Sequence, residues 1–341
     1  MTGVLDVLKT GPSVTVQDMG RIGQLGQGVG QGGAADKLAL AEGAALLGQD
    51  IGCACLEMAA LGGTFRASRD LRIALTGAPM SVEREGEALR WNAAHLLKAG
   101  QVLSIGSVRS GVYGYLHVGG GLENAPVLGS RSAHLLAGLG RMVQPGDQLP
   151  LGTDPNARVG VTLEVADRTK GGNFRVVETP QTILFDPDTR QRFFATSFKR
   201  DARANRMGVR VDCGEAAGFS ASGQLSLVSD FALPGDIQMT GNGDPAVLLV
   251  EAQTTAGYPR IGTVIPCDLP RIAQANFSAP IIFELVDRET ALGLQRKADA
   301  EMAALASRVV PLVRDPRDIP DLLSYQLIDG VISAHKEPEA P

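Results

Sequence analysis

Short apolar segments, separated by clusters of glycine, proline and aspartate, dominate the hydrophobic pattern of this chain. Most of these segments are rich in β-branched or aromatic side chains, a composition typical of β-strands. The pattern predicts strands at residues 71–76, 112–118, 159–165, 174–177, 181–185, 246–250 and 281–286. Because these strands do not alternate with full-length helices, the pattern disfavours a doubly wound parallel sheet and favours barrels or sandwiches.

Helical spacing of apolar residues is clearest over 34–47, where Gly48 follows as a stop signal, and it returns after Ala291. The segment 167–173 is polar and contains two glycines, which makes it the best candidate for a linker. We therefore expect three units along the chain. They are residues 1–170, residues 171–291, and a helical C-terminal segment with a tail at 292–341.

The composition of the chain argues against several classes of function. Hydrophobic residues make up 44% of the 341 positions and charged residues 20%, which is typical of a globular protein, and the 42 glycines indicate many turns. The net charge of −5 offers no basic field for a nucleic acid or an anionic membrane surface. No apolar run of membrane-spanning length and no targeting segment is visible, and the four cysteines are sparse, so we expect reduced thiols and a cytoplasmic location. The four histidines lack ligand spacing, so no metal site is predicted.

The densest set of neutral polar groups follows the predicted strand at 246–250. Gln253, Thr254, Thr255 and Tyr258 lie within six residues, in a bend that also contains glycine and proline. Loops at strand ends commonly carry binding groups, and amide, hydroxyl and phenol groups suit a small amide or carboxylate ligand. The alternative is a decorated hairpin turn.

A second polar corner ends the apolar alternation at residues 14–16. Gln17, Asp18 and Arg21 lie within five residues, beside glycines. An arginine in this setting can present its guanidinium to a carboxylate. The alternative is a local Asp18–Arg21 ion pair that fixes a turn.

Residues 28–33 satisfy the pattern G-x-G-x-x-G, which is found in dinucleotide-binding domains. That fingerprint requires a strand running directly into the first glycine, and residues 21–27 do not form a strand pattern. Dinucleotide binding is therefore disfavoured, although glycines before a helix can leave backbone N–H groups free for an anion. Asp36 is expected to cap that helix. No phosphate-binding loop and no G-x-S-x-G nucleophile motif is found.

A basic run precedes Asn205-Arg206-Met207-Gly208. Lys199, Arg200 and Arg203 are expected on a solvated face. Arg206 follows a turn-prone asparagine, a context that could aim its guanidinium inward at a carboxylate.

Several of these segments, taken in order, resemble one protein family over roughly residues 11–290. They are VQDMGRIG, GQGGAADKLALAEGAALLGQD, CLEMAALGG and IALTGAPM in the first half, and NRMGVRVDC and PGDIQMTGNGDPAVLLVEAQTTAGYPRIGTVIPCDLPRIAQ in the second. The family is the allophanate hydrolase subunit 2 or biotin-dependent carboxyltransferase-like group. The resemblance implies a mainly β protein in which residues 1–170 and 171–291 are cyclophilin-like β-barrel domains, with a few short helices.

The resemblance also implies a function: a subunit of an ATP-dependent 5-oxoprolinase, which opens the lactam of 5-oxoproline. Its partners would be a subunit 1 (KipI-like) protein and a LamB/YcsF-type subunit, and the ATP site cannot be placed in this chain. Two alternatives remain open. One is a carboxyltransferase that acts on urea or another amide with biotin carried by another chain. The other is a regulatory protein that sequesters a subunit 1-like partner.

Residue types suggest how such a site would work. Arg21 or Arg206 would hold the substrate carboxylate through paired hydrogen bonds. Asp18 would accept a proton or orient the substrate. The amide would be engaged by the remaining polar residues of the two corners, namely Gln17, Gln253, Thr254, Thr255 and Tyr258. We expect the two corners to meet around one cleft.

Overall fold

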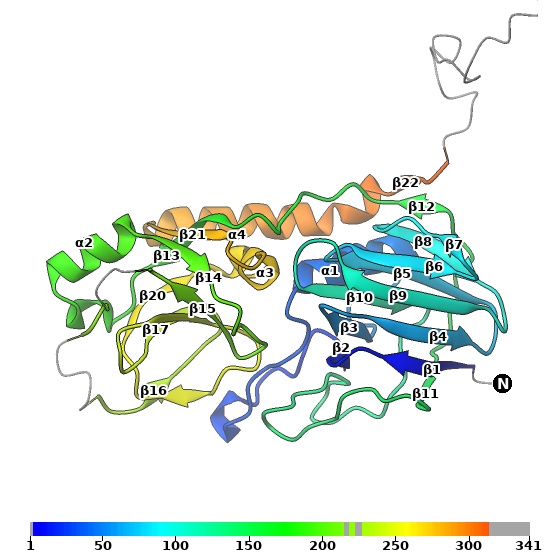
Figure 1. Ribbon diagram of the computed structural model, residues 1–341, viewed down its shortest axis with the longest axis horizontal. Coiled ribbons are helices and arrows are strands. Elements are labelled where there is room, and N and C mark those ends of the chain that lie inside the picture. Colours follow the sequence, from blue (N-terminus) through cyan, green and yellow to red (C-terminus); the bar gives the residue numbers. More distant parts are fainter. Residues whose placement is uncertain (1–2, 215–217, 222–226, 314–341) are drawn as a thin grey trace, which may run out of the picture.

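The computed structural model describes residues 3–214, 218–221 and 227–313 of the chain. Two domains built mainly of β-strands lie side by side along the long axis of the molecule, and helix α4 (Arg288–Ala303) runs along one side of both (Figure 1). The expectation of a mainly β protein with a few short helices is confirmed. No helix within the described ranges is both long and apolar enough to cross a membrane.

The first domain consists of two sheets that share one core. One sheet has the strand order β11-β1-β4-β9-β6-β7 and the other β2-β3-β10-β5-β8-β12-β22. Fully buried side chains from both sheets, such as Phe65 and Ile73, meet between them. The strands are β1 Val4–Thr10, β2 Val14–Gln17, β3 Cys55–Ala59, β4 Gly63–Ala67, β5 Leu71–Gly77, β6 Met80–Arg84, β7 Glu87–Ala88, β8 Ala93–Leu97, β9 Val102–Val108, β10 Tyr113–Val118, β11 Gln148–Pro150, β12 Val161–Thr162 and β22 Val310–Pro311.

The second domain is a closed barrel with the strand order β13-β20-β17-β18-β15-β14-β21. Helix α2 (Pro187–Ala195) contributes Phe193 to the barrel core, where its ring lies 5.1 Å from that of Phe198 and 5.3 Å from that of Phe283. The strands are β13 Gly172–Val177, β14 Ser197–Arg200, β15 Gly208–Asp212, β17 Asp236–Met239, β18 Pro245–Leu248, β20 Arg260–Val264 and β21 Pro280–Leu285. A separate two-stranded sheet pairs β16 (Asp230–Phe231) with β19 (Thr255–Ala256).

Helix α1 (Lys37–Leu47) confirms the helix predicted over 34–47. The side chain of Asp36 caps it by accepting the N–H of Ala39, as expected, and Gly48 ends it with φ 60°. One face of the helix packs on β5 and β10, where Gly43 lies directly over the ring of His117.

Two strand predictions need correction. Residues 181–185 form a 3₁₀ turn, η2 (Thr182–Leu184), because the Thr182 hydroxyl accepts the N–H of Thr179 and fixes a local turn. Of the strand predicted over 159–165, only β12 (Val161–Thr162) is formed. Helices α2 and α3 (Leu269–Gln274) were not predicted. The described residues also form the 3₁₀ turns η1 Leu25–Gln27, η4 Pro266–Asp268 and η5 Leu305–Arg308.

The segment predicted as a linker is firmly anchored between the domains. Arg168 is buried, and its guanidinium pairs with Asp36 at 2.7 Å and with both oxygens of Glu42. Gln274 of the second domain also donates to Asp36 (2.9 Å) and accepts the N–H of Tyr113 (3.0 Å). These contacts join the two domains through buried polar groups.

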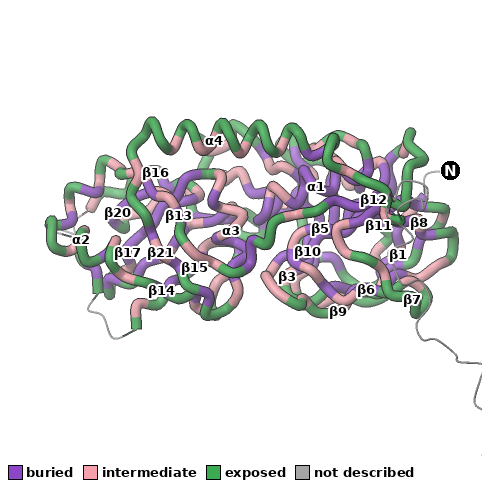
Figure 2. Tube along the Cα trace, turned by 90° about the horizontal axis from the view of Figure 1, so that it is seen from above, coloured by how far each residue is buried: buried purple, intermediate pink, exposed green. Residues whose placement is uncertain are grey.

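The C-terminal segment returns to the first domain. Helix α4 has no buried residue and lies exposed along the upper side of the molecule (Figure 2). After it, β22 pairs with β12 of the first domain. The tail predicted at the end of the chain, residues 314–341, lies outside the described residues, and the domain boundaries themselves stay predictions.

Candidate active site at the domain junction

The polar corner at residues 17–21 is buried against the segment 130–134 of the same domain. Asp18 accepts three hydrogen bonds, from the N–H of Gly20 (2.8 Å), the hydroxyl of Ser130 (2.6 Å) and the N–H of Arg131 (2.6 Å). Both of its oxygens are therefore engaged in holding the 130–131 turn. Gln17 is fully buried and donates to the carbonyl of Ala133 (3.1 Å).

Arg21 is the largest buried charged side chain of this corner, with 1% of its surface exposed. Its Nη2 donates to the carbonyl of Ser132 at 2.5 Å, whereas Nε and Nη1 are buried without a partner among the described residues. Burial lowers the pKa of Arg21, while the charges of Asp18 and Glu251 oppose that change. In the described part of the chain, no Asp18–Arg21 ion pair forms, so the alternative of a local pair fixing the turn is wrong.

His134 lies next to Arg21. Sequence analysis did not predict it as a site residue, because no motif or ligand spacing surrounds it. The ring is 2% exposed, and Nδ1 accepts the N–H of Ala137 (3.3 Å), so the neutral ring carries its proton on Nε2. Burial lowers the pKa of His134 and favours that neutral form. Nε2 is buried and has no partner within the described ranges. A Cβ placed on Gly32 would lie 3.1 Å from the His134 ring and 3.2 Å from Arg21 Nη1, so both side chains flank the same glycine segment.

This glycine segment belongs to the G-x-G-x-x-G pattern at residues 28–33. It follows η1 rather than a strand, as the sequence indicated, so it lacks the geometry of a dinucleotide-binding loop. Its glycines instead allow the backbone to pass close over the donors of Arg21 and His134. Three buried N–H groups in this corner, Arg21 Nε and Nη1 and His134 Nε2, therefore have no acceptor among the described residues. A carboxylate or carbonyl oxygen is the kind of group that such donors bind.

The loop with the polar residues 253–258 begins beside the glycine segment, where residues 250–252 contact it. The N–H of Gly32 donates to the carbonyl of Val250 (3.1 Å), and a Cβ on Gly30 would lie 3.5 Å from the carbonyl oxygen of Ala252. The loop then continues along the surface, with Thr254 half-buried. Gln253, Thr255 and Tyr258 are exposed.

Arg206 is aimed inward, as its context indicated, but the carboxylates that it meets belong to the protein. Its Nε lies 2.7 Å from Glu251, Nη1 bonds Glu57, and Nη2 donates to the carbonyl of Gly33 (2.7 Å). Burial alone would lower the pKa of Arg206, but the charges of Glu57 and Glu251 outweigh it and raise that pKa. Glu57 also accepts the hydroxyl of Tyr115 (2.7 Å). All three nitrogens of Arg206 are engaged, so Arg21 has the free donors.

The three basic residues before Arg206 were all expected to be exposed, but the structure exposes only two of them. Lys199 and Arg203 are exposed, as predicted, and Arg203 pairs with Asp201 at 2.5 Å. The prediction for Arg200 is wrong, because this side chain is 6% exposed. Residues two apart on a strand share a face, so Arg200 lies on the same inward face as Phe198.

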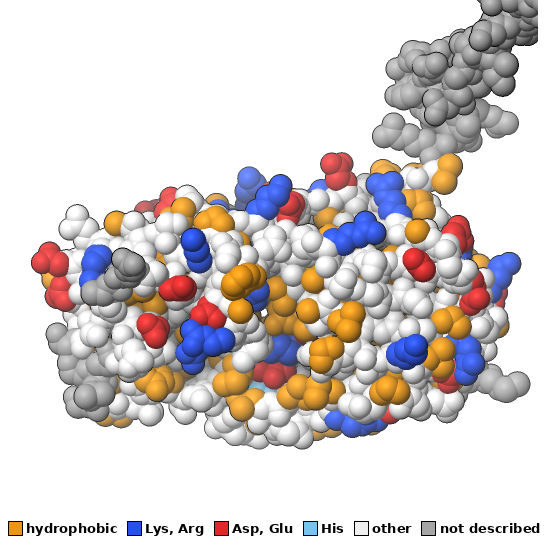
Figure 3. All heavy atoms as spheres, in the orientation of Figure 1, with side chains coloured by type: hydrophobic (Ala, Val, Ile, Leu, Met, Phe, Trp, Pro, Cys, Tyr) orange, Lys and Arg blue, Asp and Glu red, His pale blue; other side chains and the backbone are white. Residues whose placement is uncertain are grey.

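Figure 3 shows the junction from one side. Midway along the molecule, where the two domains meet, hydrophobic side chains surround a group of basic and acidic ones. No group of three or more His, Cys, Asp or Glu residues placed to hold a metal ion is found in the part of the chain that the structure describes.

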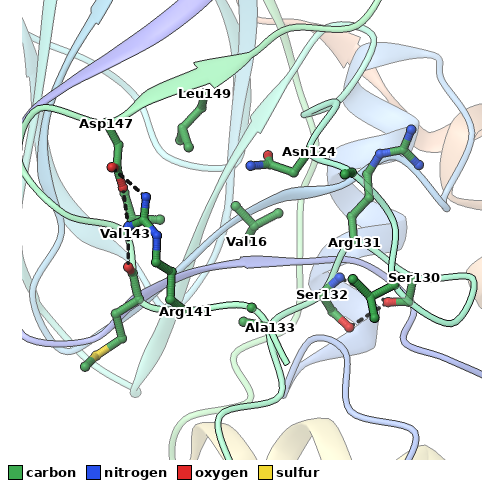
Figure 4. Close-up of a pocket in the computed structure, with 14 residues that line it drawn as sticks. Val16, Asn124, Ser130, Arg131, Ser132, Ala133, Arg141, Val143, Asp147 and Leu149 are labelled. Atoms are coloured by element: carbon green, nitrogen blue, oxygen red, sulfur yellow. Dashed lines mark hydrogen bonds and ion pairs between the residues drawn. The ribbon is translucent and has the colours of Figure 1, made fainter. Parts of the chain in front are cut away.

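A cavity of about 220 Å³ lies in the first domain, and the segment 130–133 forms part of its wall (Figure 4). Ser130, which bonds Asp18, and Ser132, which bonds Arg21, contribute to its wall, and an Arg141–Asp147 ion pair (2.7 Å) closes part of it. It is smaller than most ligand pockets, which have volumes of roughly 300–1,000 Å³. None of the site residues predicted from the sequence lines it.

Comparison with known proteins defines the class. The family described as carboxyltransferase domain, subdomains A and B, matches residues 27–285, and this chain belongs to that family. A 5-oxoprolinase subunit of Escherichia coli K12 is 33% identical over 312 residues, which cover 90% of this chain and 99% of that protein. The corresponding 5-oxoprolinase subunit of Haemophilus influenzae is 30% identical, covering 86% and 95%. The urea amidolyase of Saccharomyces cerevisiae is 23% identical over 88% of this chain and 18% of that protein.

Solved structures give the same fold. The crystal structure of TTHA0988 superposes with a TM-score of 0.76 and 29% identity, covering 83% of this chain and 56% of that one. The K. lactis urea amidolyase superposes with a TM-score of 0.80 and 22% identity, covering 92% and 21%. This chain thus spans about half of TTHA0988 and about a fifth of the urea amidolyase.

Proposed function

We propose that this chain is a subunit of an ATP-dependent 5-oxoprolinase, which opens the lactam ring of 5-oxoproline to give glutamate. The observation that carries the proposal is the 33% identity to the 5-oxoprolinase subunit of E. coli along 99% of its length. The buried donors of Arg21 and His134 add chemical support, because 5-oxoproline is a compact lactam that carries one carboxylate.

In this proposal Arg21 binds the substrate carboxylate through Nε and Nη1, and His134 Nε2–H donates a further hydrogen bond. Asp18 acts as an orienting group, since its two oxygens hold the 130–131 turn that leads to Ser132, the residue whose carbonyl positions Arg21. Gln17 supports the same segment through Ala133. Arg206 acts by holding the two domains together at the junction.

The exposed loop of the second domain completes the proposed site. Gln253, Thr254, Thr255 and Tyr258 are proposed to engage the lactam amide, whose N–H and C=O match their hydroxyl and amide groups. ATP is used by the complex, together with a subunit 1 (KipI-like) protein and a LamB/YcsF-type subunit.

Reconstitution tests this function. The chain is co-expressed with the two partner subunits, purified as a complex, and assayed for glutamate and ADP formed from 5-oxoproline and ATP. We expect equal amounts of both products when all three proteins and ATP are present, and none when this chain is omitted. A complex that assembles fully but forms no glutamate would contradict the proposal.

A carboxyltransferase is the second candidate, favoured by the family description and by the similarity to urea amidolyases. In that case biotin is carried by another chain, and activity requires bicarbonate and is blocked by avidin. Avidin-insensitive glutamate formation separates the two functions. Tight binding to the subunit 1-like partner without any turnover would instead indicate a regulatory protein.

A further inference from the structure

Arg200 lies on the inward face of β14, at the edge of the closed barrel. Side chains along this strand alternate between buried and exposed. Phe198 lies in the barrel core, Lys199 is exposed, and Arg200 is buried. Its partner in the adjacent strand, Val211, is buried as well. The Nε of Arg200 is buried without a partner among the described residues, whereas Nη1 and Nη2 at the tip of the guanidinium reach the surface.

No carboxylate of the described residues neutralises the charge of Arg200. Among the residues that the structure describes, the Arg200 guanidinium makes no ion pair or hydrogen bond, and its Nε is fully buried. The contrast with Arg168 and Arg206 is clear, because each of these pairs with two carboxylates. Burial lowers the pKa of Arg200, and Tyr113 is the group that opposes the change. An isolated buried charge is unfavourable unless a counter-charge reaches it.

Tyr113 comes from β10 of the first domain and is 2% exposed. It packs in the same core cluster as the barrel residues, so it covers the barrel where the domains meet. The backbones of the two residues bind the same segment, 274–279, because the Gln274 side chain accepts the N–H of Tyr113 (3.0 Å) and the Ala279 carbonyl accepts the N–H of Arg200 (3.1 Å). Domain interfaces and barrel mouths are common positions for ligand sites.

We propose that Arg200 and the Tyr113 hydroxyl bind a small oxyanion, a carboxylate or a phosphate, at the mouth of the second barrel. The guanidinium fork matches two oxygens of either group, and the phenol supplies one further donor. The proposal concerns a site separate from Arg21, and it does not depend on the 5-oxoprolinase function.

Thermal unfolding of the full chain tests the site, because a ligand that binds the folded state raises the midpoint with its concentration. Inorganic phosphate and acetate are titrated in separate arms at constant ionic strength into the wild type, Arg200→Met and Lys199→Met. Lys199→Met is the matched control, since it removes the same charge from the exposed neighbouring position. The series is repeated with Arg21→Met to subtract anion binding at the polar corner of residues 17–21.

We expect Arg200→Met to unfold at an equal or higher temperature than the wild type without anion, and to lose the anion-dependent rise that Lys199→Met keeps. The anion that gives the larger rise in the unfolding midpoint of the wild type identifies phosphate or carboxylate as the ligand. If anion raises the unfolding midpoint of Arg200→Met as much as that of Lys199→Met, the proposal is overturned. So would a loss of stability that is the same with and without anion, since that indicates packing alone. If Arg200→Met does not fold, Tyr113→Phe is titrated instead. A weakened anion response supports the site, and an unchanged one refutes it.

Discussion

Four buried arginines at the domain junction differ in what neutralises them. Arg168 and Arg206 each pair with two carboxylates, which fixes their positions and uses their donors. Arg21 and Arg200 have no carboxylate partner within the described ranges. Carboxylate partners hold Arg168 and Arg206 in place, whereas an arginine without a counter-ion keeps its donors for an anionic ligand.

Arg21→Met tests the role of the polar corner at residues 17–21. In the reconstituted complex we expect kcat/KM for 5-oxoproline to fall by about tenfold to a hundredfold, because a hydrogen bond to a charged group contributes about 1.5–3 kcal/mol. Turnover of 2-pyrrolidinone, the same lactam without its carboxylate, should be unchanged by the substitution. Steady-state kinetics with both substrates provides the measurement.

The control for this experiment is Arg66→Met, which removes an exposed arginine paired with Asp6 and should leave both rates unchanged. Equal loss with the two lactams in Arg21→Met would show that the residue acts on the fold and not on the substrate carboxylate.

At the level of elements, Gly43 of α1 shows how packing overrides helix propensity. The His117 ring is fully buried, burial lowers its pKa to about 3, and its Nε2 lies 2.8 Å from the Thr76 hydroxyl. A Cβ on Gly43 would lie 2.3 Å from that ring nitrogen. Because the ring is fixed in the core, it cannot move aside without breaking its own hydrogen bond.

We therefore expect Gly43→Ala to destabilise the protein by about 1–3 kcal/mol, the usual cost of overpacking, despite the better helix propensity of alanine. Gly293 of α4 is the matched control, because it is exposed and no atom of the described residues lies within 4 Å of its added Cβ. Gly293→Ala should stabilise by about 0.5–1 kcal/mol. Denaturant unfolding measures both changes, and a stabilising Gly43→Ala would contradict the described packing.

The elements that could be predicted are those whose signal is local. The helix over 34–47 carries its own cap and stop residues, and β5, β10 and β21 are short segments rich in apolar residues. Helix α2 has few apolar residues, and its packing rests on Phe193 entering a core made by distant strands. The periodicity of apolar residues within the segment therefore does not predict that contact.

On the scale of the whole molecule, the two domains are joined by buried polar contacts. Arg206 connects Glu251 of its own domain with Glu57 of the other. Arg206→Met would leave two buried carboxylates without a counter-charge. We expect a loss of about 3–5 kcal/mol in the free energy of unfolding, the usual cost of breaking a buried pair from one side.

Arg203→Met is the comparison for this variant, since Arg203 lies three residues earlier and its ion pair is exposed. Its unfolding midpoint in denaturant should match that of the wild type. If Arg206→Met also unfolds at the wild-type midpoint, the junction does not depend on the ion-paired cluster.

The sequence by itself determined the mainly β class, the α1 helix with its Asp36 cap, the inward aim of Arg206 and the family, because each of these is written in local patterns or in ordered motifs. It also pointed to Arg21, but it placed Arg200 on the surface and passed over His134. Only the tertiary structure decided which arginines meet carboxylates and which do not. Ion pairing across the junction depends on residues more than a hundred positions apart, such as Arg206 and Glu57, and no local pattern encodes their meeting.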